Sequence, residues 1–145
     1  MIDDNVFKRI DFNGSKGFIF IGEKLLVYRR DANVTNFPLM IDLPGGGKEG
    51  DETPFETFTR EAKEEFGIEI KKENIVHSKA HQSIVEPWKQ SYFFVAKLPA
   101  SEEKNIVFGT EGTEFYLLEV DDYLNRKDII DRHRVRLMDY LSLNK

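Results

Sequence analysis

Three glutamates at helical spacing are the residues of this sequence whose types and positions point most directly to chemistry. At roughly 100° per residue, Glu61, Glu64 and Glu65 fall on one side of a helix, well away from its hydrophobic side. Like charges three and four residues apart weaken an isolated helix by about 0.2–0.5 kcal/mol per pair, so this arrangement favours a bound cation. Mg²⁺ prefers hard oxygen ligands and is commonly held by one or two carboxylates together with substrate phosphates. The spacing therefore predicts a divalent-cation site; the alternative is a solvated acidic face that is partly neutralised by Arg60 pairing with Glu64.

The helix that must carry these carboxylates has a clear start and end in the sequence. Residues 53–56, Thr-Pro-Phe-Glu, fit a capping box with Thr53 as the N-cap and proline at the first helical position. Gly67 is suited to the left-handed conformation that ends many helices. The positions at helical spacing that predict the core-facing side are Phe55, Phe58, Ala62 and Phe66.

The glycine run at residues 45–47 precedes this helix and follows a short predicted strand at 41–44. Three glycines allow the backbone to approach a ligand closely or to adopt positive φ angles. Residues 45–50 also fit the dinucleotide pattern G-x-G-x-x-G, but that pattern needs a helix that opens within the glycine turn, whereas this helix begins only at Thr53. We therefore interpret the glycines as a loop that can approach a ligand and not as a dinucleotide-binding turn.

The remaining elements indicate an α+β or α/β sandwich. Hydrophobic and β-branched runs predict strands at 17–22, 24–30, 75–84, 91–98 and 114–120, and an amphipathic pattern predicts a last helix at 127–141. Strands therefore stand before and after a central helix. A chain of 145 residues without linker-like stretches is expected to form a single domain, 1–145.

Composition excludes several classes of function. Lysine and arginine number 21 and aspartate and glutamate 26, a formal charge of -5, which does not favour a nucleic-acid polymer as partner. Cysteine is absent and there are three histidines, which excludes thiolate nucleophiles and disfavours a zinc site. No apolar run approaches the roughly 20 residues of a membrane span, and the acidic start is unlike a signal peptide. We expect a soluble cytoplasmic protein that does not bind membranes.

The spacing of residues 46–68 resembles the Nudix box at every specified position. These positions are Gly46, then Glu52 after five residues, then Arg60-Glu61-Ala62 after seven, then Glu64-Glu65 and Gly67-Ile68. At average composition, a match of this kind arises by chance on the order of once in ten million such chains. The sequence is therefore identified as similar to the Nudix hydrolases of the MutT type.

The resemblance implies a fold, an activity and roles for individual residues. Nudix proteins are α/β/α sandwiches with a mixed sheet, and they hydrolyse compounds in which a nucleoside diphosphate is linked to another group, using Mg²⁺ or Mn²⁺. By resemblance, Glu61, Glu64, Glu65 and the carbonyl of Gly45 would bind metal, and Glu61 would also orient or deprotonate the attacking water. Arg60 would hold the glutamates in place and Glu52 would stabilise loop and helix. Many members use a further acidic residue from a later loop, for which Glu111 is the first choice here and Glu114 the second.

The sequence signals for substrate-binding residues are less specific than the Nudix box. Arg29 and Arg30 end a predicted strand, where one would face the site and the other solvent, and Lys48 follows the glycine run; all three suit a phosphate. Several aromatic residues could stack on a base, although core packing is the favoured interpretation for each: Phe37, Trp88, Tyr92 and Tyr116. His77 and His81 share a face of a predicted strand, and we expect them to be structural or surface residues.

The substrate class follows by elimination. The proline that marks many ADP-ribose hydrolases some fifteen residues past the box is absent, since Gln82 and Ser83 lie there, and an acidic protein does not suit an RNA substrate. The expectation is hydrolysis of a small nucleotide, such as a non-standard or oxidised nucleoside triphosphate, by a protein that is dimeric if it follows its relatives. The alternatives are an ADP-ribose or dinucleoside polyphosphate hydrolase, a nucleotide-sensing domain without turnover, and a domain whose acidic helix has no chemical role.

Overall fold

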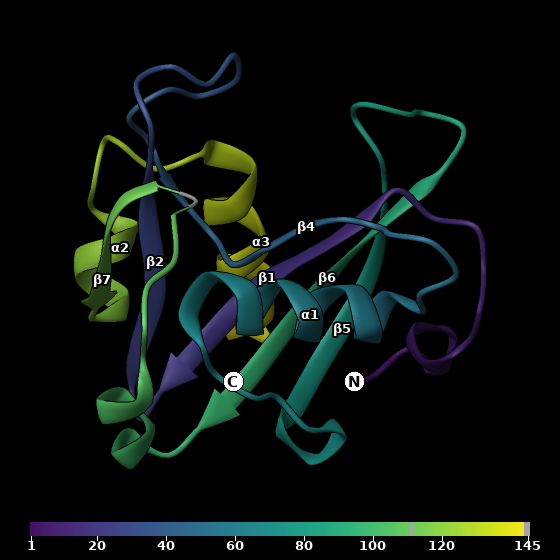
Figure 1. The fold of residues 1–145 in the computed structure, drawn as a ribbon, viewed down its shortest axis with the longest axis horizontal. Helices are drawn as coiled ribbons and strands as arrows, with labels where there is room; N and C mark the ends of the chain where they lie inside the picture. Colours follow the sequence, from purple (N-terminus) through teal and green to yellow (C-terminus); the bar gives the residue numbers. More distant parts are fainter. Residues whose placement is uncertain (111, 144–145) are drawn as a thin grey trace.

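A mixed β-sheet forms the centre of the computed structural model, which describes residues 1–110 and 112–143 (Figure 1). Within these residues the sheet has seven strands in the order β3-β2-β1-β6-β5, with β4 paired to β1 and β7 to β2. The pairing of β1 with β6 is parallel and the other pairings are antiparallel. The strands are β1 (Gly14–Ile21), β2 (Lys24–Arg30), β3 (Ile41–Asp42), β4 (Gly45–Gly47), β5 (Ile75–Gln82), β6 (Gln90–Leu98) and β7 (Gly112–Leu118).

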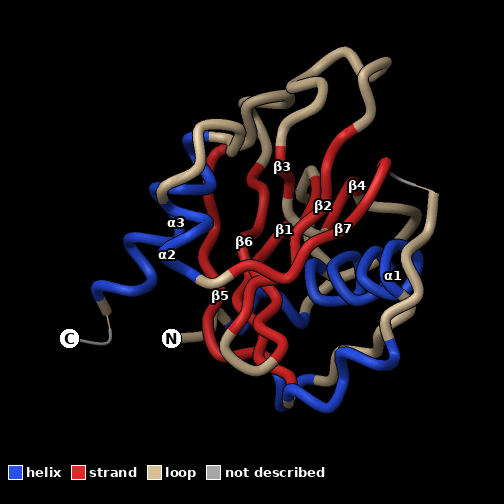
Figure 2. Tube along the Cα trace, turned by 90° about the vertical axis from the view of Figure 1, so that its left-hand side faces the viewer, coloured by secondary structure: helices blue, strands red, loops and turns tan. Residues whose placement is uncertain are grey.

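Helices cover both faces of the sheet. Figure 2 shows α1 (Pro54–Phe66) on one side of the strands, and α2 (Val120–Leu124) and α3 (Asp131–Ser142) on the other. The described residues also form three short 3₁₀ helices: η1 (Asp4–Phe7), η2 (Lys72–Asn74) and η3 (Ala100–Asn105). This arrangement is the α/β/α sandwich with a mixed sheet that the resemblance implied.

Successive side chains of the central strands point to alternate faces of the sheet, which explains why both faces of the sheet are apolar. In β1, Ile19 and Ile21 pack in the core on the α1 side, whereas Phe18 and Phe20 pack in the core on the α3 side. Successive side chains of a strand point to opposite faces, so a nearly continuous apolar run is required where a sheet is covered twice. The sheet therefore holds α1 and α3 at fixed positions on opposite faces.

The segment before the last helix differs from the prediction. The helix begins at Asp131 rather than at 127, and the expected strand at 114–120 ends at Leu118, after which α2 begins. The amide of Ile41 donates to the carbonyl of Asp128 at 2.7 Å, and Ile129 forms a parallel bridge with Ile41. Pairing with a distant strand therefore keeps residues 128–130 extended, although their sequence is compatible with a helix.

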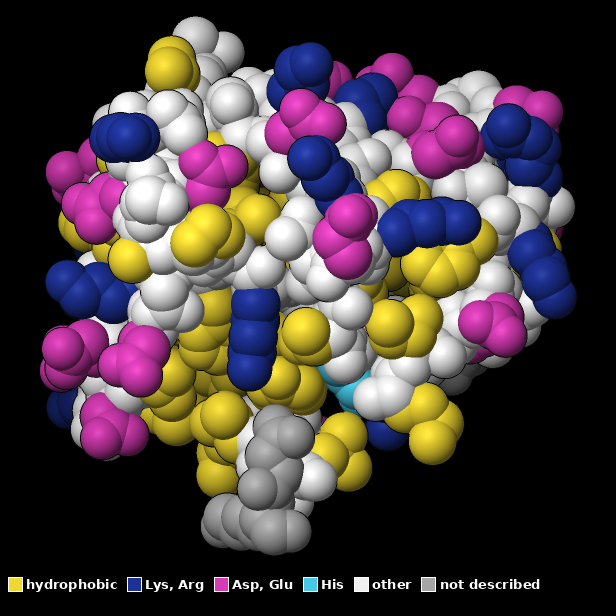
Figure 3. Space-filling model, turned by 90° about the horizontal axis from the view of Figure 1, so that it is seen from below, with side chains coloured by type: hydrophobic (Ala, Val, Ile, Leu, Met, Phe, Trp, Pro, Cys, Tyr) yellow, Lys and Arg dark blue, Asp and Glu magenta, His cyan; other side chains and the backbone are white. Residues whose placement is uncertain are grey.

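Charged residues of both signs share the surface. Seen from below (Figure 3), the Lys and Arg side chains are interspersed with Asp and Glu, and hydrophobic side chains gather in the lower part of the view. Neither sign of charge dominates this face, so it produces no strong field of one sign. Within the described part of the chain, no helix has the length and hydrophobicity that a membrane span requires.

Buried histidines should make folding stability depend on pH. Burial holds the pKa of His133 well below its usual range, with Asp42 opposing the shift and Lys16 supporting it, and burial also lowers the pKa of His81, to about 4. The unfolded chain takes up protons near pH 6.5, whereas the folded chain resists them, so the free energy of unfolding decreases as the pH falls below 6.5. The expected slope is about 1.4 kcal/mol per pH unit for the fully buried His133 and smaller for the half-buried His81.

Urea unfolding between pH 7.5 and 4.5 measures this slope. His133→Gln should make the plot of unfolding free energy against pH shallower by the contribution of one buried histidine. An unchanged slope in that variant would show that His133 is protonated in the folded protein.

Candidate active site

The acidic helix α1 is anchored at both ends as the sequence predicts. The amide of Glu56 donates to Thr53 Oγ1 at 3.1 Å, and the amide of Thr53 donates to Glu56 Oε1 at 2.9 Å, which completes the capping box. Gly67 ends the helix with φ +68°, the left-handed conformation for which glycine is favoured. The capping contacts therefore fix the helix on which the candidate ligands stand.

Arg60 lies at the centre of the acidic cluster. Its Nη1 donates to Glu61 Oε1 and to Glu64 Oε1, each at 2.9 Å, and its Nη2 donates to the carbonyl of Gly47 at 2.9 Å. The guanidinium thus neutralises two helix carboxylates and joins them to β4. The predicted pairing of Arg60 with Glu64 is confirmed, and this geometry supports the role of a residue that holds the glutamates in place.

Glu52 connects the loop before the helix with the helix itself. Its Oε2 accepts from Arg60 Nε at 2.6 Å, while its Oε1 accepts from the amide of Glu49 and from Thr57 Oγ1, each at 2.9 Å. Burial alone would raise the pKa of Glu52, but the hydrogen bond from Arg60 and those from Glu49 and Thr57 lower it. The carboxylate therefore stays ionised and ties both segments to Arg60.

Glu65 differs from the other two glutamates, and the prediction that all three lie well away from the hydrophobic side was wrong for it. Its side chain is 1% exposed, against 13% for Glu61 and 52% for Glu64. At 100° per residue, Glu65 lies only about 20° from Phe58 around the helix axis, so it points toward the sheet. There its Oε1 accepts from the amide of Gly45 at 3.0 Å.

The glycine strand β4 approaches the helix closely enough that side chains are excluded at one position. A Cβ atom at Gly46 would lie 2.7 Å from the carboxylate of Glu61, whereas a Cβ at Gly47 would meet nothing within 4 Å. Gly45 adopts φ +133°. Gly46 therefore leaves the space that the Glu61 carboxylate occupies beside β4, whereas the contact does not require a glycine at position 47.

Gly46→Ala should displace the Glu61 carboxylate and lower hydrolytic activity by about 10-fold or more, since small displacements of positioned groups have large effects on rate. Gly47→Ala is the matched control, because its added methyl group has free space. The measurement is kcat/KM with a nucleotide and Mg²⁺, together with thermal unfolding of both variants. Equal activities would show that the position of Glu61 is not critical.

The chemistry of the donor set fits a hard divalent cation. Glu61, Glu64 and Glu65 offer carboxylate oxygens from one stretch of helix, and β4 passes beside them. Among residues 1–110 and 112–143, no three acidic or histidine side chains already converge as a metal-binding group. Arg60 holds Glu61 and Glu64 in its own hydrogen bonds, so we expect these carboxylates to reorient when a cation binds.

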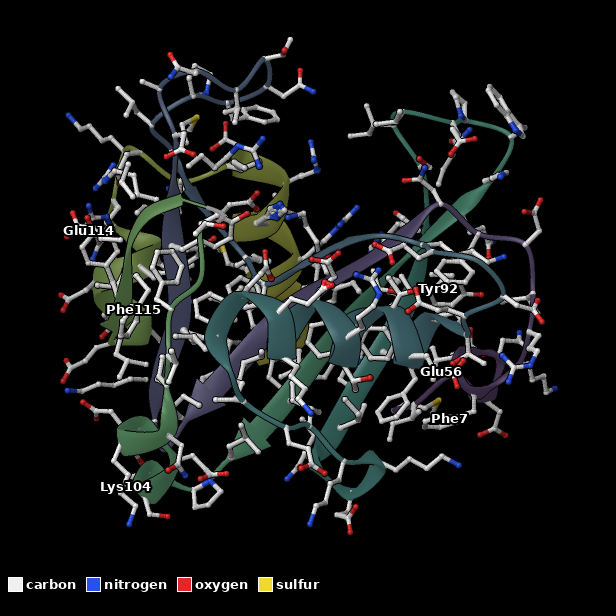
Figure 4. All side chains as sticks on the ribbon, viewed as in Figure 1. Phe7, Glu56, Tyr92, Lys104, Glu114 and Phe115 are labelled. Carbon is white, nitrogen blue, oxygen red and sulfur yellow. The ribbon has the colours of Figure 1, made fainter. Side chains whose placement is uncertain are left out.

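The predictions for the two acidic residues of the later loop, Glu111 and Glu114, have different outcomes. Glu111 lies outside the described residues, although the amide of Gly109 donates to the carbonyl of Glu65 at 2.8 Å and so places the preceding loop beside α1. Glu114 hydrogen-bonds with the hydroxyl of Tyr116. Figure 4 shows Glu114 at the outer edge of the molecule, and its neighbour Phe115 packs in the core on the α1 side. The second choice, Glu114, therefore faces away from the acidic helix.

The three candidate phosphate contacts have partners within the protein. Arg29 Nη2 pairs with Asp128 at 3.2 Å, and Arg30 Nη1 pairs with Asp42 at 2.7 Å. The two side chains are similarly covered, 23% and 22% exposed, so the prediction that one of them faces solvent was wrong. Lys48 Nζ donates to the carbonyl of residue 10. Substrate binding by Arg29, Arg30 and Lys48 remains a prediction.

The aromatic residues divide between core and surface. Tyr92 is buried, as the core interpretation expects, but Trp88 is 75% exposed in the turn between β5 and β6, and Phe37 is also exposed. Core packing was therefore wrong for Trp88 and Phe37. His77 and His81 line a small cavity beneath α3, as side chains on one face of β5.

A pocket of about 230 Å³ that the sequence did not reveal borders β4. It lies between β1, β4, the β5–β6 turn and α3, and Lys16, Arg132, His133 and Arg136 are among the residues that line it. The only signal in the sequence was a pair of arginines four residues apart in the last predicted helix. Nothing in the sequence placed that helix beside the glycine strand.

Comparison with solved structures shows the same fold in several proteins. The MutT protein from Methanosarcina mazei Go1 is 21% identical, with a TM-score of 0.72 over 94% of this chain and 99% of that one. The bifunctional NMN adenylyltransferase/ADP ribose pyrophosphatase from Francisella tularensis is 16% identical, with a TM-score of 0.74 over 92% of this chain and 41% of that one. The C. elegans Ap4A hydrolase is 19% identical, with a TM-score of 0.64 over 89% and 98%.

Sequence comparison gives the family directly. No curated protein matches the chain significantly. The model of the NUDIX domain, however, matches residues 15–139, which include the acidic helix, β4 and most of α3. The chain therefore belongs to the Nudix family.

Proposed function

We propose that this protein is a pyrophosphohydrolase that cleaves nucleoside diphosphate-linked compounds with the help of Mg²⁺ or Mn²⁺. The observation that carries the proposal is the joining of Glu61, Glu64 and β4 by Arg60, with Glu65 bonded to the amide of Gly45. After Glu61 and Glu64 reorient, the carboxylate oxygens and the carbonyl of Gly45 would form a site for a hard cation beside β4. A solved structure of the Francisella protein is described as complexed with AMP and Mn ion.

The residues of α1 and the neighbouring strand would have different roles in the reaction. Glu61, Glu64, Glu65 and the carbonyl of Gly45 would hold the cation, which supplies charge neutralisation for phosphate oxygens and a more acidic bound water. Glu61 would orient the attacking water and accept its proton. The water oxygen forms a bond to phosphorus as the phosphoanhydride bond breaks, and the leaving phosphate takes the bonding electrons. Arg60 and Glu52 act by keeping the carboxylates in position.

Small nucleotides are the substrates that we propose to test first, beginning with non-standard or oxidised nucleoside triphosphates. The named relatives include a MutT protein, an ADP ribose pyrophosphatase and an Ap4A hydrolase, so the panel also includes ADP-ribose and diadenosine tetraphosphate. We further propose that residues 1–145 act as one domain and that the protein works in the cytoplasm, either as a monomer or as a homodimer.

The deciding experiment offers this panel to the purified protein with Mg²⁺, with Mn²⁺ and with EDTA, and measures release of phosphate and pyrophosphate. Turnover that requires the cation is the expected result. Binding of a nucleotide without any turnover would instead assign a sensing role.

A further inference from the structure

The pocket beside β4 has a charge opposite to that of the acidic helix. We define the basic pocket by its three cationic side chains, Lys16, Arg132 and Arg136. Among the described residues that line it, none is an aspartate or glutamate, although the whole chain carries a formal charge of -5. Cations gathered in a cleft of an acidic protein focus the local field and attract anions.

The two arginines of the basic pocket lack acidic partners. Within residues 1–110 and 112–143, neither Arg132 nor Arg136 forms an ion pair. Asp139 lies three residues beyond Arg136 on the same helix, but the two side chains do not pair. Arg132 lies over the ring of Phe37, with 5.5 Å from Cζ to the ring centroid. Burial lowers the pKa of Arg136, and the charge of Arg132 lowers it further. Two neighbouring guanidinium groups without a counterion favour an anionic ligand.

Lys16 and His133 form the floor of the basic pocket. Lys16 Nζ pairs with Asp42 Oδ2 at 3.0 Å, so this lysine is already neutralised and the arginines carry the excess charge. His133 is 1% exposed, and both of its ring nitrogens lack a hydrogen-bond partner among the described residues. A buried polar group without a partner is costly, so this histidine is a further group that a ligand could satisfy.

The basic pocket and the acidic helix meet at the glycine strand β4. Gly46 lines the basic pocket, and its own Cβ position faces the carboxylate of Glu61. The two charged regions therefore share the glycine strand β4, although α1 and α3 lie on opposite faces of the sheet (Figure 2). A substrate lying along β4 would present one anionic part to each region.

We infer that the basic pocket binds a phosphate group of the substrate that is separate from the diphosphate cleaved at the acidic helix. The inference deepens the proposed function and rests on it, because it assumes that the diphosphate lies beside Glu61. Within the nucleoside diphosphate-linked compounds of the proposed function, it points to those that carry a phosphomonoester on the part that is not cleaved, which ordinary nucleoside triphosphates do not, with Arg132 and Arg136 as the residues that select it.

The test uses two pairs of diphosphates that differ by one phosphomonoester: ADP-ribose with its 2′-phosphorylated derivative, and dephospho-coenzyme A with coenzyme A. Titration calorimetry in EDTA measures the dissociation constants without any contribution from divalent cations. In at least one pair, the wild type should bind the phosphorylated member about 10-fold more tightly or better. Arg136→Gln and Arg132→Gln should each reduce this preference to about threefold or less, and added NaCl should weaken it.

Lys104→Gln is the matched control, because it removes one positive charge at η3, which Figure 4 shows on the opposite side of the molecule from Tyr92, a residue that lines the pocket. It should keep the wild-type preference, and thermal unfolding should show that all three variants are folded. Equal affinities within both pairs in the wild type, or a preference that survives in both arginine variants, would overturn the inference. Two variants are used so that loss of folding in one of them leaves the other decisive.

Parallel assays with Mg²⁺ separate this inference from the proposed function. Cation-dependent cleavage without any preference for the phosphorylated compounds would reject the inference and keep the proposed function. A preference in EDTA without cleavage of any nucleotide would reject the proposed function and leave the basic pocket as a phosphate site.

Discussion

Replacing Glu65 by glutamine should lower kcat by at least about two orders of magnitude, the usual scale for loss of a positioned electrostatic group. Glutamine keeps an oxygen that can accept the hydrogen bond from the amide of Gly45, so the local structure should survive. What is lost is the negative charge at the most buried of the three candidate ligands. Phosphate or pyrophosphate release with saturating Mg²⁺ measures the effect, and thermal unfolding measures the fold.

Glu103→Gln provides the control for this prediction. Glu103 is exposed on η3, and its replacement should leave kcat within about twofold of the wild type, as for most surface substitutions. Turnover by the Glu65 variant at the wild-type rate would remove Glu65 from the set of metal ligands. A folded Glu65 variant with low activity, beside an active Glu103 variant, supports the assignment.

Arg60→Gln should lower both stability and activity. The hydrogen bonds of Arg60 to Glu52, Glu61 and Glu64 raise the pKa of the guanidinium above its usual value, with the bond to Glu52 contributing most. Without this charge the carboxylates repel one another, and we expect a loss of about 1–3 kcal/mol in the free energy of unfolding. Because the carboxylates are no longer positioned, kcat should also fall about 10-fold or more.

Urea unfolding with and without Mg²⁺ at constant ionic strength tests the physical reason. A divalent cation can replace the lost positive charge, so Mg²⁺ should stabilise the Arg60 variant more than it stabilises the wild type. Arg9→Gln is the matched control, because the pair between Arg9 and Glu56 is exposed and should contribute less than about 1 kcal/mol. Equal stability of the Arg60 variant and the wild type would contradict the central position of Arg60.

Local interactions explain why the acidic helix could be predicted from the sequence. Its start at Thr53, its end at Gly67 and the pairing of Arg60 with Glu64 depend on residues within a few positions of one another. The hairpin of β1 and β2 is similarly local, since Gly22 supplies the positive φ that the turn needs. The spacing of residues 46–68, which lies within and just before this helix, identified both the family and the candidate cation site.

Contacts between distant segments decided the rest. The extended conformation of residues 128–130 depends on Ile41, and the burial of Glu65 depends on the amide of Gly45, twenty residues earlier in the chain. A helical pattern alone shows which residues share a side, but the sheet decides how far that side is buried.

The sequence by itself determined which residues could hold a cation, because their spacing on one helix fixes their relative positions. Only the tertiary structure decided that α3 lies beside β4 and brings Arg132, Arg136 and His133 to the opposite side of the glycine strand. The reason is that β1, β4 and α3 are far apart in the chain, so their proximity depends on sheet pairing and on packing against both faces of the sheet.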